Sequence, residues 1–267
     1  MLRFSGVGVS DVGLVRPDNE DSAFVGPYVA LVADGVGGAA AGEVASATAA
    51  YAMAATALAR FGDPPEAVLR AGAEAAGASV QRGVQSDLRR LGMATTLTAV
   101  VCDGRRVVVG HVGDSRAYHL RDGALSQVSR DHTYVQRLVD RGEIDLRVAW
   151  RHPWRNVVLR SVDGDPVHEE IDLVPLAVET GDRLLLCSDG LTDLVPDTTI
   201  VGLLSTADPH SAAARLVRAA LDAGGKDNVT CVVVDVVDGP RVVGDGQLLG
   251  AVREIGNIVD PGAVRTR

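Results

Sequence analysis

The sequence predicts an α+β fold in which antiparallel β-sheets and paired helices form layers. Its elements follow the order strands, two helices, strands, two helices, strand, and helices grouped in this way are typical of a layered sandwich. Asp103-Gly104 and Asp122-Gly123 separate short apolar segments in the middle of the chain, as hairpin turns do. Apolar residues make up 46% of the 267 residues and aromatics only 3%, so a sizeable core must be built from Ala, Val and Leu.

The first third of the chain is predicted to contain two strands followed by two long helices. The strands are 3–9 and 22–33, which flank a polar insert at 16–21. The first helix, 41–61, is rich in alanine. The second, 64–91, starts at a pair of prolines and carries most of its charges on one side, as a solvated helix does.

The remaining elements are strands and helices around one irregular segment. Residues 95–127 are interpreted as an antiparallel meander of short strands. Residues 131–165 are polar, arginine-rich and irregular, which predicts a loop. The elements that follow are predicted as strands 169–174 and 183–188, helices 197–205 and 210–223, a last strand 228–237, and a tail or weakly attached segment at 239–267.

Composition excludes several classes of function. A net charge of −9 and a pI near 5.1 argue against a nucleic-acid partner, which needs a basic surface. The three cysteines lie in apolar runs without a C-x-x-C pair, which indicates reduced thiols and a cytoplasmic location rather than cysteine catalysis. The chain has no apparent signal peptide, and its alanine-rich stretch 51–58 is too short to span a membrane.

Three apolar runs end in an aspartate. Residues 29–33 run into Asp34, 107–113 into Asp114, and 184–188 into Asp189. An Asp at such a position is often ordinary turn chemistry. Repeated on three strongly apolar strands, however, the pattern places several hard oxygen ligands at sheet edges, as a site for divalent cations requires.

The segment after the first of these strands invites a competing interpretation. Residues 35–40 read Gly-x-Gly-x-x-Ala between a strand and a helix, which matches a loose dinucleotide-binding fingerprint. Asp34 directly before it would repel a pyrophosphate, and no acid follows about twenty residues on. We therefore favour a cation site, to which the Gly35 carbonyl offers a further oxygen.

Further charged residues strengthen the cation site. Glu20 and Asp21 lie in the polar insert, and Asp227 comes directly before the last strand. Because the histidines lack zinc-site spacing, this all-oxygen set favours Mg²⁺ or Mn²⁺. Arg16 precedes Glu20 by four residues, and a guanidinium beside a metal cluster suits a phosphate ligand.

At these residues the chain resembles the metal-dependent protein phosphatases of the protein phosphatase 2C type, above all the bacterial serine/threonine phosphatases. The resemblance covers about residues 5–237 and implies a four-layer αββα sandwich, two antiparallel sheets flanked by pairs of helices, with a binuclear metal site at one edge. The segments that carry it are Arg16-Pro17-Asp18-Asn19-Glu20-Asp21-Ser22, Ala33-Asp34-Gly35-Val36-Gly37-Gly38, Gly113-Asp114-Ser115-Arg116, Cys187-Ser188-Asp189-Gly190-Leu191 and Asp227-Asn228-Val229-Thr230.

The resemblance also implies the ligands of two ions, Mn²⁺ or Mg²⁺. Asp34 would bridge both and act in catalysis, and Asp189 and Asp227 would complete the first site. Glu20, through water, and the carbonyl of Gly35 would serve the second.

Three further roles follow from the resemblance. Asp114, with Asp189, would hold a third and weaker metal ion. Arg16 would bind the substrate phosphate and take part in catalysis. Asp21 would stand behind the ligands without binding metal itself.

The implied activity is hydrolysis of phosphoserine and phosphothreonine in proteins, with water held between the two ions as the attacking group. Its substrates would be phosphorylated proteins, including a cognate serine/threonine kinase that the enzyme opposes. The alternatives are a phosphatase-like regulatory binding module without activity and a phosphatase of anti-sigma-factor antagonists.

The chain departs from the family pattern at two positions. Val36 stands where many relatives have a histidine proposed as general acid and bacterial relatives often have methionine, so the proton donor is unassigned. Ala94 stands where glycine is common, and we expect little consequence from this change.

The resemblance divides the chain into a catalytic domain, 1–238, and a tail, 239–267. Residues 131–165 match a variable flap beside the active site. It is interpreted either as a solvated loop anchored by aromatics or as a surface that meets phosphoprotein substrates. The candidate flap residues for such contacts are Arg147, Trp150, Arg151, His152, Trp154 and Arg155.

Overall fold

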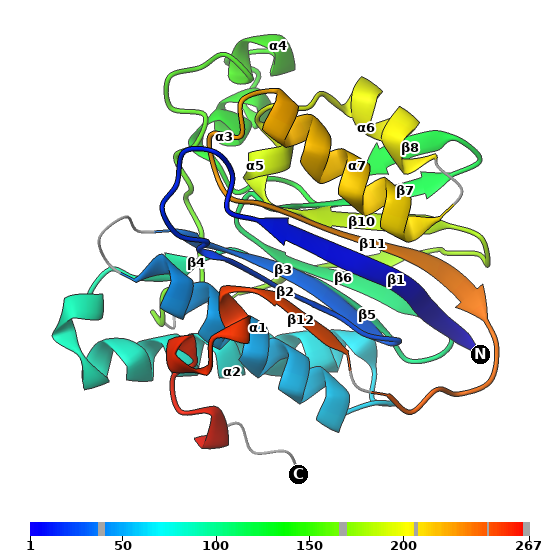
Figure 1. The fold of residues 1–267 in the computed structure, drawn as a ribbon, viewed down its shortest axis with the longest axis horizontal. Helices are drawn as coiled ribbons and strands as arrows, with labels where there is room; N and C mark the ends of the chain where they lie inside the picture. The colour runs from blue at the N-terminus through cyan, green and yellow to red at the C-terminus, as the bar shows by residue number, and fades with distance from the viewer. Residues whose placement is uncertain (37–40, 166–169, 206–207, 245, 264–267) are drawn as a thin grey trace.

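Two antiparallel β-sheets lie face to face in the structure, and helices cover the outer face of each (Figure 1). The structure is a computed structural model that describes residues 1–36, 41–165, 170–205, 208–244 and 246–263. All strand pairs within these residues are antiparallel. The predicted α+β sandwich of four layers, αββα, is therefore confirmed.

The strands of each sheet come from distant parts of the chain. The first sheet has the order β1 (Leu2–Asp11), β11 (Val229–Asp238), β10 (Arg183–Cys187), β7 (Arg116–Arg121) and β8 (Ala124–Gln127). The second has the order β12 (Gln247–Gly250), β2 (Asp21–Val25), β3 (Val29–Val36), β5 (Leu97–Cys102), β6 (Val107–Val112) and β9 (Asp172–Leu176), and β4 (Ala94–Thr95) pairs with β3.

The helices form the two outer layers. On the second sheet lie α1 (Gly42–Ala59) and α2 (Pro65–Ser86), which a 3₁₀ turn η1 (Leu88–Arg90) follows. On the first sheet lie α5 (Asp189–Thr192), α6 (Asp197–Leu204) and α7 (Pro209–Asp222). Outside the layers, the predicted loop contains two short helices, α3 (Tyr134–Asp140) and α4 (Leu146–Ala149). After β12 come three 3₁₀ turns, η2 (Ala251–Arg253), η3 (Ile255–Asn257) and η4 (Pro261–Ala263).

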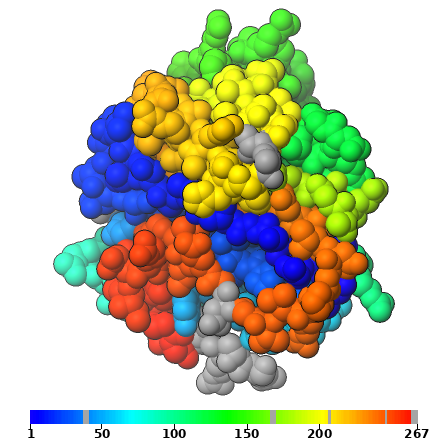
Figure 2. All heavy atoms as spheres, turned by 45° about the vertical axis from the view of Figure 1, so that its right-hand side comes forward, coloured from blue at the N-terminus to red at the C-terminus, as the bar shows by residue number. Residues whose placement is uncertain are grey.

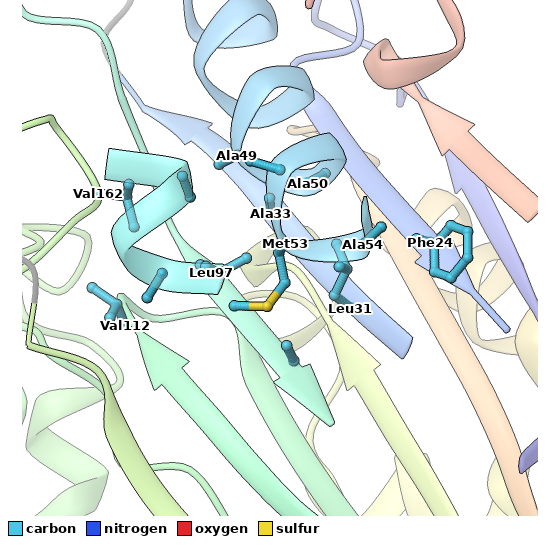
Figure 3. Packing of buried hydrophobic residues seen from close by; sticks show 14 of the residues in the cluster. Phe24, Leu31, Ala33, Ala49, Ala50, Met53, Ala54, Leu97, Val112 and Val162 are labelled. Atoms are coloured by element: carbon cyan, nitrogen blue, oxygen red, sulfur yellow. The ribbon is translucent and has the colours of Figure 1, made fainter. Parts of the chain in front are cut away.

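Three apolar cores hold the four layers together, one between each pair of neighbouring layers. The core between the sheets consists largely of Val, Ala and Leu side chains, with Val32 and Val232 fully buried. Between α1 and the second sheet, alanines bring the helix close, and Figure 3 shows Met53 between Leu31 and Leu97 of the sheet. Small side chains thus replace aromatics throughout, as the composition indicates.

One predicted strand proves to be two. Residues 22–33 form the β2–β3 hairpin, and the turn begins at Gly26, whose N–H donates to the carbonyl of Val29 at 2.8 Å. The apolar run continues through this turn, but Pro27 has no N–H to give to a sheet ladder. The run therefore folds back on itself and brings both of its ends to the same edge of the sandwich.

The short antiparallel strands predicted over 95–127, with hairpin turns at Asp103-Gly104 and Asp122-Gly123, are confirmed, but they do not form one continuous meander. β5 and β6 form a hairpin in the second sheet, whereas β7 and β8 form another in the first. Gly113, with φ +111°, turns the chain out of β6, so it crosses from one sheet to the other instead of making a third hairpin. Asp114 lies on this crossing.

The prediction of a weakly attached C-terminal segment is wrong for residues 247–259. β12 pairs with β2 along four residues, and Ala251 and Val252 are buried. The prediction failed because the apolar run that forms β12 is too short for its periodicity to indicate a strand. The division into a catalytic domain and a tail remains a prediction.

No helix among the described residues combines the length and the apolar character that crossing a bilayer requires.

We expect Met53→Ala to lower the free energy of unfolding by about 2–5 kcal/mol, because it leaves a cavity between α1 and the second sheet. Leu58→Ala, on the same helix but 44% exposed, should change the stability by no more than about 0.5 kcal/mol. Urea denaturation followed by circular dichroism measures both. Equal effects of the two substitutions would contradict this account of the core.

Candidate metal centre

The acids that the sequence singles out converge on one edge of the sandwich. Asp21 and Asp34 are direct register partners on β2 and β3. Asp114 follows β6, Asp189 begins α5 directly after β10, and Asp227 precedes β11. Carboxylates from both sheets therefore lie together at this edge of the sandwich.

The electrostatics of these carboxylates reflect their proximity. The pKa of Asp34 is raised well above its ordinary value because the group is withdrawn from water and because Asp21 and Asp189 lie near it. Burial, together with Asp114, likewise raises the pKa of Asp189. The pKa of Asp114 itself rises to about 7, mainly through burial. Uncompensated negative charge is thus concentrated here, and a divalent cation would relieve it.

Asp21 is fully buried behind this cluster. Its Oδ2 accepts a 2.7 Å hydrogen bond from the Ser188 hydroxyl, which itself accepts one from the N–H of Thr230. Burial raises the pKa of Asp21 to about 6, although the bond from Ser188 opposes this shift. Its other oxygen, Oδ1, is buried and has no hydrogen-bond partner among the described residues, which is uncommon for a buried acceptor.

The backbone comes unusually close around Glu20 and Gly35. The Gly35 N–H donates to the Glu20 carbonyl at 3.1 Å. A Cβ at Gly35 would stand 2.3 Å from the carbonyl oxygen of Gly42, so only glycine fits. Glu20 has a raised pKa, mainly through burial, although Arg16 opposes the shift.

Arg16 lies on the loop beside these acids and contacts two of them. Its Nη2 donates to Asp227 Oδ2 at 2.8 Å, and its Nη1 is 4.0 Å from Glu20 Oε2. The bond to Asp227 raises the pKa of Arg16. A guanidinium has five donor hydrogens, so donors remain for a phosphate even while this ion pair is formed.

Asn228, which sequence reasoning missed, fixes the loop that carries Arg16 and Glu20. Its amide nitrogen donates to the carbonyls of Val12 and Asp18, both at 2.9 Å, and its oxygen accepts from the Glu20 N–H at 2.7 Å. A polar residue directly after Asp227 is the only signal that the sequence offers for it.

Thr96 also fixes a site residue through hydrogen bonds, and sequence reasoning missed it as well. Its hydroxyl accepts from the Asp34 N–H at 2.9 Å and bonds the hydroxyl of Ser115 at 2.7 Å. It thereby joins the backbone of Asp34 to the residue after Asp114. Nothing in the local sequence distinguishes this threonine from its neighbour Thr95.

The flap borders the cluster on one side. A cleft of about 970 Å³ lies between it and the sandwich. The cleft lining includes Asp114 and Asp189 and all the candidate flap residues except Trp154, that is Arg147, Trp150, Arg151, His152 and Arg155.

The flap tryptophans do not anchor it in the core. Trp150 and Trp154 are 50% and 58% exposed, and Trp154 packs edge-on against Tyr134 with 5.5 Å between the ring centroids. Any anchoring of the loop by aromatics therefore comes from contacts within the flap, where Trp154 also packs on His152.

An ion pair connects the flap to the cluster. Arg155 donates to Asp193 at 2.7 Å, and Asp193 also raises the pKa of both Asp114 and Asp189. Sequence reasoning missed Asp193, although its position four residues after Asp189, one helical turn away, is a usable signal.

The donor set fits a divalent cation by its chemistry. Its side-chain donors are carboxylates, with backbone carbonyls beside them, and hard cations such as Mg²⁺ and Mn²⁺ prefer such oxygens. Within the described residues, no group of three or more His, Cys, Asp or Glu side chains is arranged so that it could hold a metal ion as it stands. The fit therefore rests on the partial burial and the mutual repulsion of these carboxylates.

Comparison with known proteins identifies the same family that the site residues indicate. Residues 12–228 match the family model "Protein phosphatase 2C". The chain is 46% identical over 238 residues to serine/threonine protein phosphatase PstP of Mycobacterium tuberculosis, covering 86% of this chain and 44% of that protein. It is 35% identical over 237 residues to serine/threonine phosphatase stp of Listeria monocytogenes, covering 85% of this chain and 93% of that protein.

Solved structures show the same likeness. The catalytic domain of PstP in complex with two manganese ions superimposes with a TM-score of 0.83 at 42% identity, covering 89% of this chain and all of that one. The chain belongs to the protein phosphatase 2C family. Its two departures from the family pattern, Val36 and Ala94, are register partners between β3 and β4.

We expect Asp34→Asn to raise the free energy of unfolding by roughly 1 kcal/mol in the presence of a chelator, because it removes one of several like charges. Thermal unfolding should shift upward by roughly 2–4 °C. Asp122→Asn, at an exposed turn with φ +50°, is the matched control and should leave the melting temperature unchanged. A lower melting temperature for Asp34→Asn would show that repulsion does not dominate at this position.

Proposed function

We propose that this chain is a metal-dependent phosphatase that hydrolyses phosphoserine and phosphothreonine in proteins. The observation that carries the proposal is the convergence of buried and partly buried carboxylates from both sheets, with Arg16 beside them. The relatives named as serine/threonine phosphatases support it. An inactive regulatory module would be expected to have lost one or more of these acids, and all the predicted ones are present.

We assign the residues to two cation positions as the family resemblance implies. Asp34, Asp189 and Asp227 would hold the first, and Asp34, Glu20 and the Gly35 carbonyl the second. The manganese ions bound to the PstP catalytic domain support Mn²⁺ or Mg²⁺ as the cofactor. Bound there, two divalent cations supply Lewis-acid activation of water and neutralise charge on the phosphoryl group.

A third and weaker cation position would lie on the flap side of the cluster. Asp114 and Asp189 border the flap cleft together, and Asp114 also raises the pKa of Asp189. The same burial and mutual repulsion that favour the first two positions therefore favour a cation between these two carboxylates.

The protein's own groups orient the substrate and limit proton transfer. Arg16 keeps donors free to bind the phosphate bidentately, and Asn228 fixes the loop that carries it. Val36 has no proton to give, so the leaving alkoxide takes its proton from another source. Asp21, held by Ser188, keeps the neighbouring ligand strand in register with Asp34.

The substrates are phosphorylated proteins, and we include a cognate serine/threonine kinase among them. The half-exposed Trp150 and the arginines of the flap cleft offer contact surface for such partners. The buried, unpaired cysteines favour a cytoplasmic setting. Because the chain spans 44% of the length of PstP, the activity of the whole protein is part of this proposal.

Removal of divalent cations should abolish hydrolysis of a phosphothreonine peptide, and Mn²⁺ should restore it. Asp189→Asn should lose activity by about 100-fold or more, since even residues behind metal ligands cost 10–100-fold in related sites. Phosphate release measured with and without Mn²⁺ tests both. Asp122→Asn serves as control, and activity that survives complete metal removal would refute the metal-dependent mechanism.

Trp150→Ala should raise KM for a phosphoprotein substrate about 5-fold, a loss typical of an exposed aromatic contact. Turnover of p-nitrophenyl phosphate, which is too small to reach the flap, should stay unchanged. Leu58→Ala, an exposed apolar residue on the outer helix layer, should alter neither. Equal effects on both substrates would exclude the flap from recognising the protein chain.

A further inference from the structure

The family match ends at residue 228. After β11 the chain forms one further strand, β12, which lies alongside β2, the strand that begins at Asp21. β12 pairs with β2 in register, with Gly250 opposite Ser22 and Leu249 opposite Ala23. β2 therefore lies between β12 and β3 rather than at the edge of the sheet. A strand with two neighbours is held more firmly than an edge strand, and Asp21 is the first residue of β2.

The end of β12 fits directly onto the backbone of Asp21. Gly250 has φ +73° and ψ −148°, a conformation that is essentially restricted to glycine. A Cβ at this position would stand 2.1 Å from the Asp21 carbonyl oxygen and 3.1 Å from the Ser10 hydroxyl. Any side chain at residue 250 would therefore push the C-terminal segment and Asp21 apart.

Hydrogen bonds then attach the segment to the same strand and to α1. The Val252 N–H donates to the Ser22 hydroxyl at 3.1 Å, and that hydroxyl bonds Ser46 of α1 at 3.0 Å. Val252 itself is 1% exposed. The start of β2 is thus tied on its outer side to a helix as well as to a strand.

The segment continues across α1. The Thr48 hydroxyl donates to the Asn257 carbonyl at 3.2 Å and accepts from the Val259 N–H at 3.0 Å. Ile258 and Val259 pack on the core beneath α1. Residues 247–259 are therefore anchored at both ends, by β12 at one end and by Thr48 of α1 at the other.

The segment also borders the site from outside. Residues 250–257 form one wall of a cleft of about 1310 Å³, whose lining includes Arg16 and Glu20. Figure 2 shows the C-terminal residues on the molecular surface beside the N-terminal part of the chain. One element thus lies against the backbone of Asp21 and lines the same cleft as Arg16 and Glu20.

We propose that residues 247–259 are a positioning element of the metal centre. They hold the start of β2, and through it Glu20 and Asp21, at a fixed distance from Asp34 on β3. Glu20 directly precedes β2, so a shift of this strand moves a proposed metal ligand. The inference rests on the proposed function, because it assumes that these carboxylates bind divalent cations.

The test compares two glycine substitutions in the chain of 267 residues. Gly250→Ala introduces the conflict with the Asp21 carbonyl, whereas Gly256→Ala, in the same segment, meets no atom within 4 Å. Isothermal titration calorimetry with MnCl₂ should show Gly250→Ala binding Mn²⁺ about 10-fold more weakly, the effect of disturbing a residue behind a ligand. Gly256→Ala should bind as the wild type does, and saturating Mn²⁺ should restore most of the activity of Gly250→Ala.

Val252→Ala is a milder second variant, which should weaken Mn²⁺ binding in the same direction if Gly250→Ala does not fold. Circular dichroism and thermal unfolding report whether each variant is folded. A folded Gly250→Ala or Val252→Ala protein that binds Mn²⁺ as tightly as the wild type overturns the inference alone. Wild-type protein that neither binds Mn²⁺ nor hydrolyses a phosphopeptide overturns the proposed function, and this inference with it.

Discussion

The mutual repulsion of carboxylates that are buried or partly buried is the constraint on which the rest of this structure depends. Asp34, Asp189 and Asp114 all have raised pKa values because they are withdrawn from water close to one another. No local element would hold them together, since each charge destabilises its neighbours. The four-layer sandwich, with three separate apolar cores, supplies the stability that this arrangement costs.

Neutral polar side chains fix the acids without cancelling their charge. Ser188 connects Asp21 on one sheet to Thr230 on the other. Asn228 fixes the backbone of Glu20, and Thr96 that of Asp34. Hydroxyl and amide groups suit this task because they orient a carboxylate or its backbone and leave the negative charge available to a cation.

The sequence was sufficient to predict those site residues whose role follows from a local sequence pattern. Asp34 and Asp189 stood out because an acid ends a strongly apolar strand. Ser188 and Asn228 were not predicted, because their partners lie about 170 and 210 residues away in the chain. Similarly, the crossing at Gly113 looks like a hairpin turn until the packing of the two sheets is known.

The short strand β12 escaped prediction for a different reason. Its four residues contain only two leucines, too few for any periodicity to register. It forms because β2 offers an unpaired edge and α1 a covering surface, and both exist only in the folded protein. Local sequence patterns therefore do not reveal the structural role of residues 247–259.

The chain crosses between the sheets at the site end of the sandwich, through the loop that carries Arg16 and Glu20 and through the turn that carries Asp114. The spacing of these groups is therefore set by the distance between the two sheets. That distance is fixed by the Val, Ala and Leu side chains packed between them. The size of these interior side chains therefore sets the spacing of the site groups, so a methyl group gained or lost in this core changes the distances between the ligands.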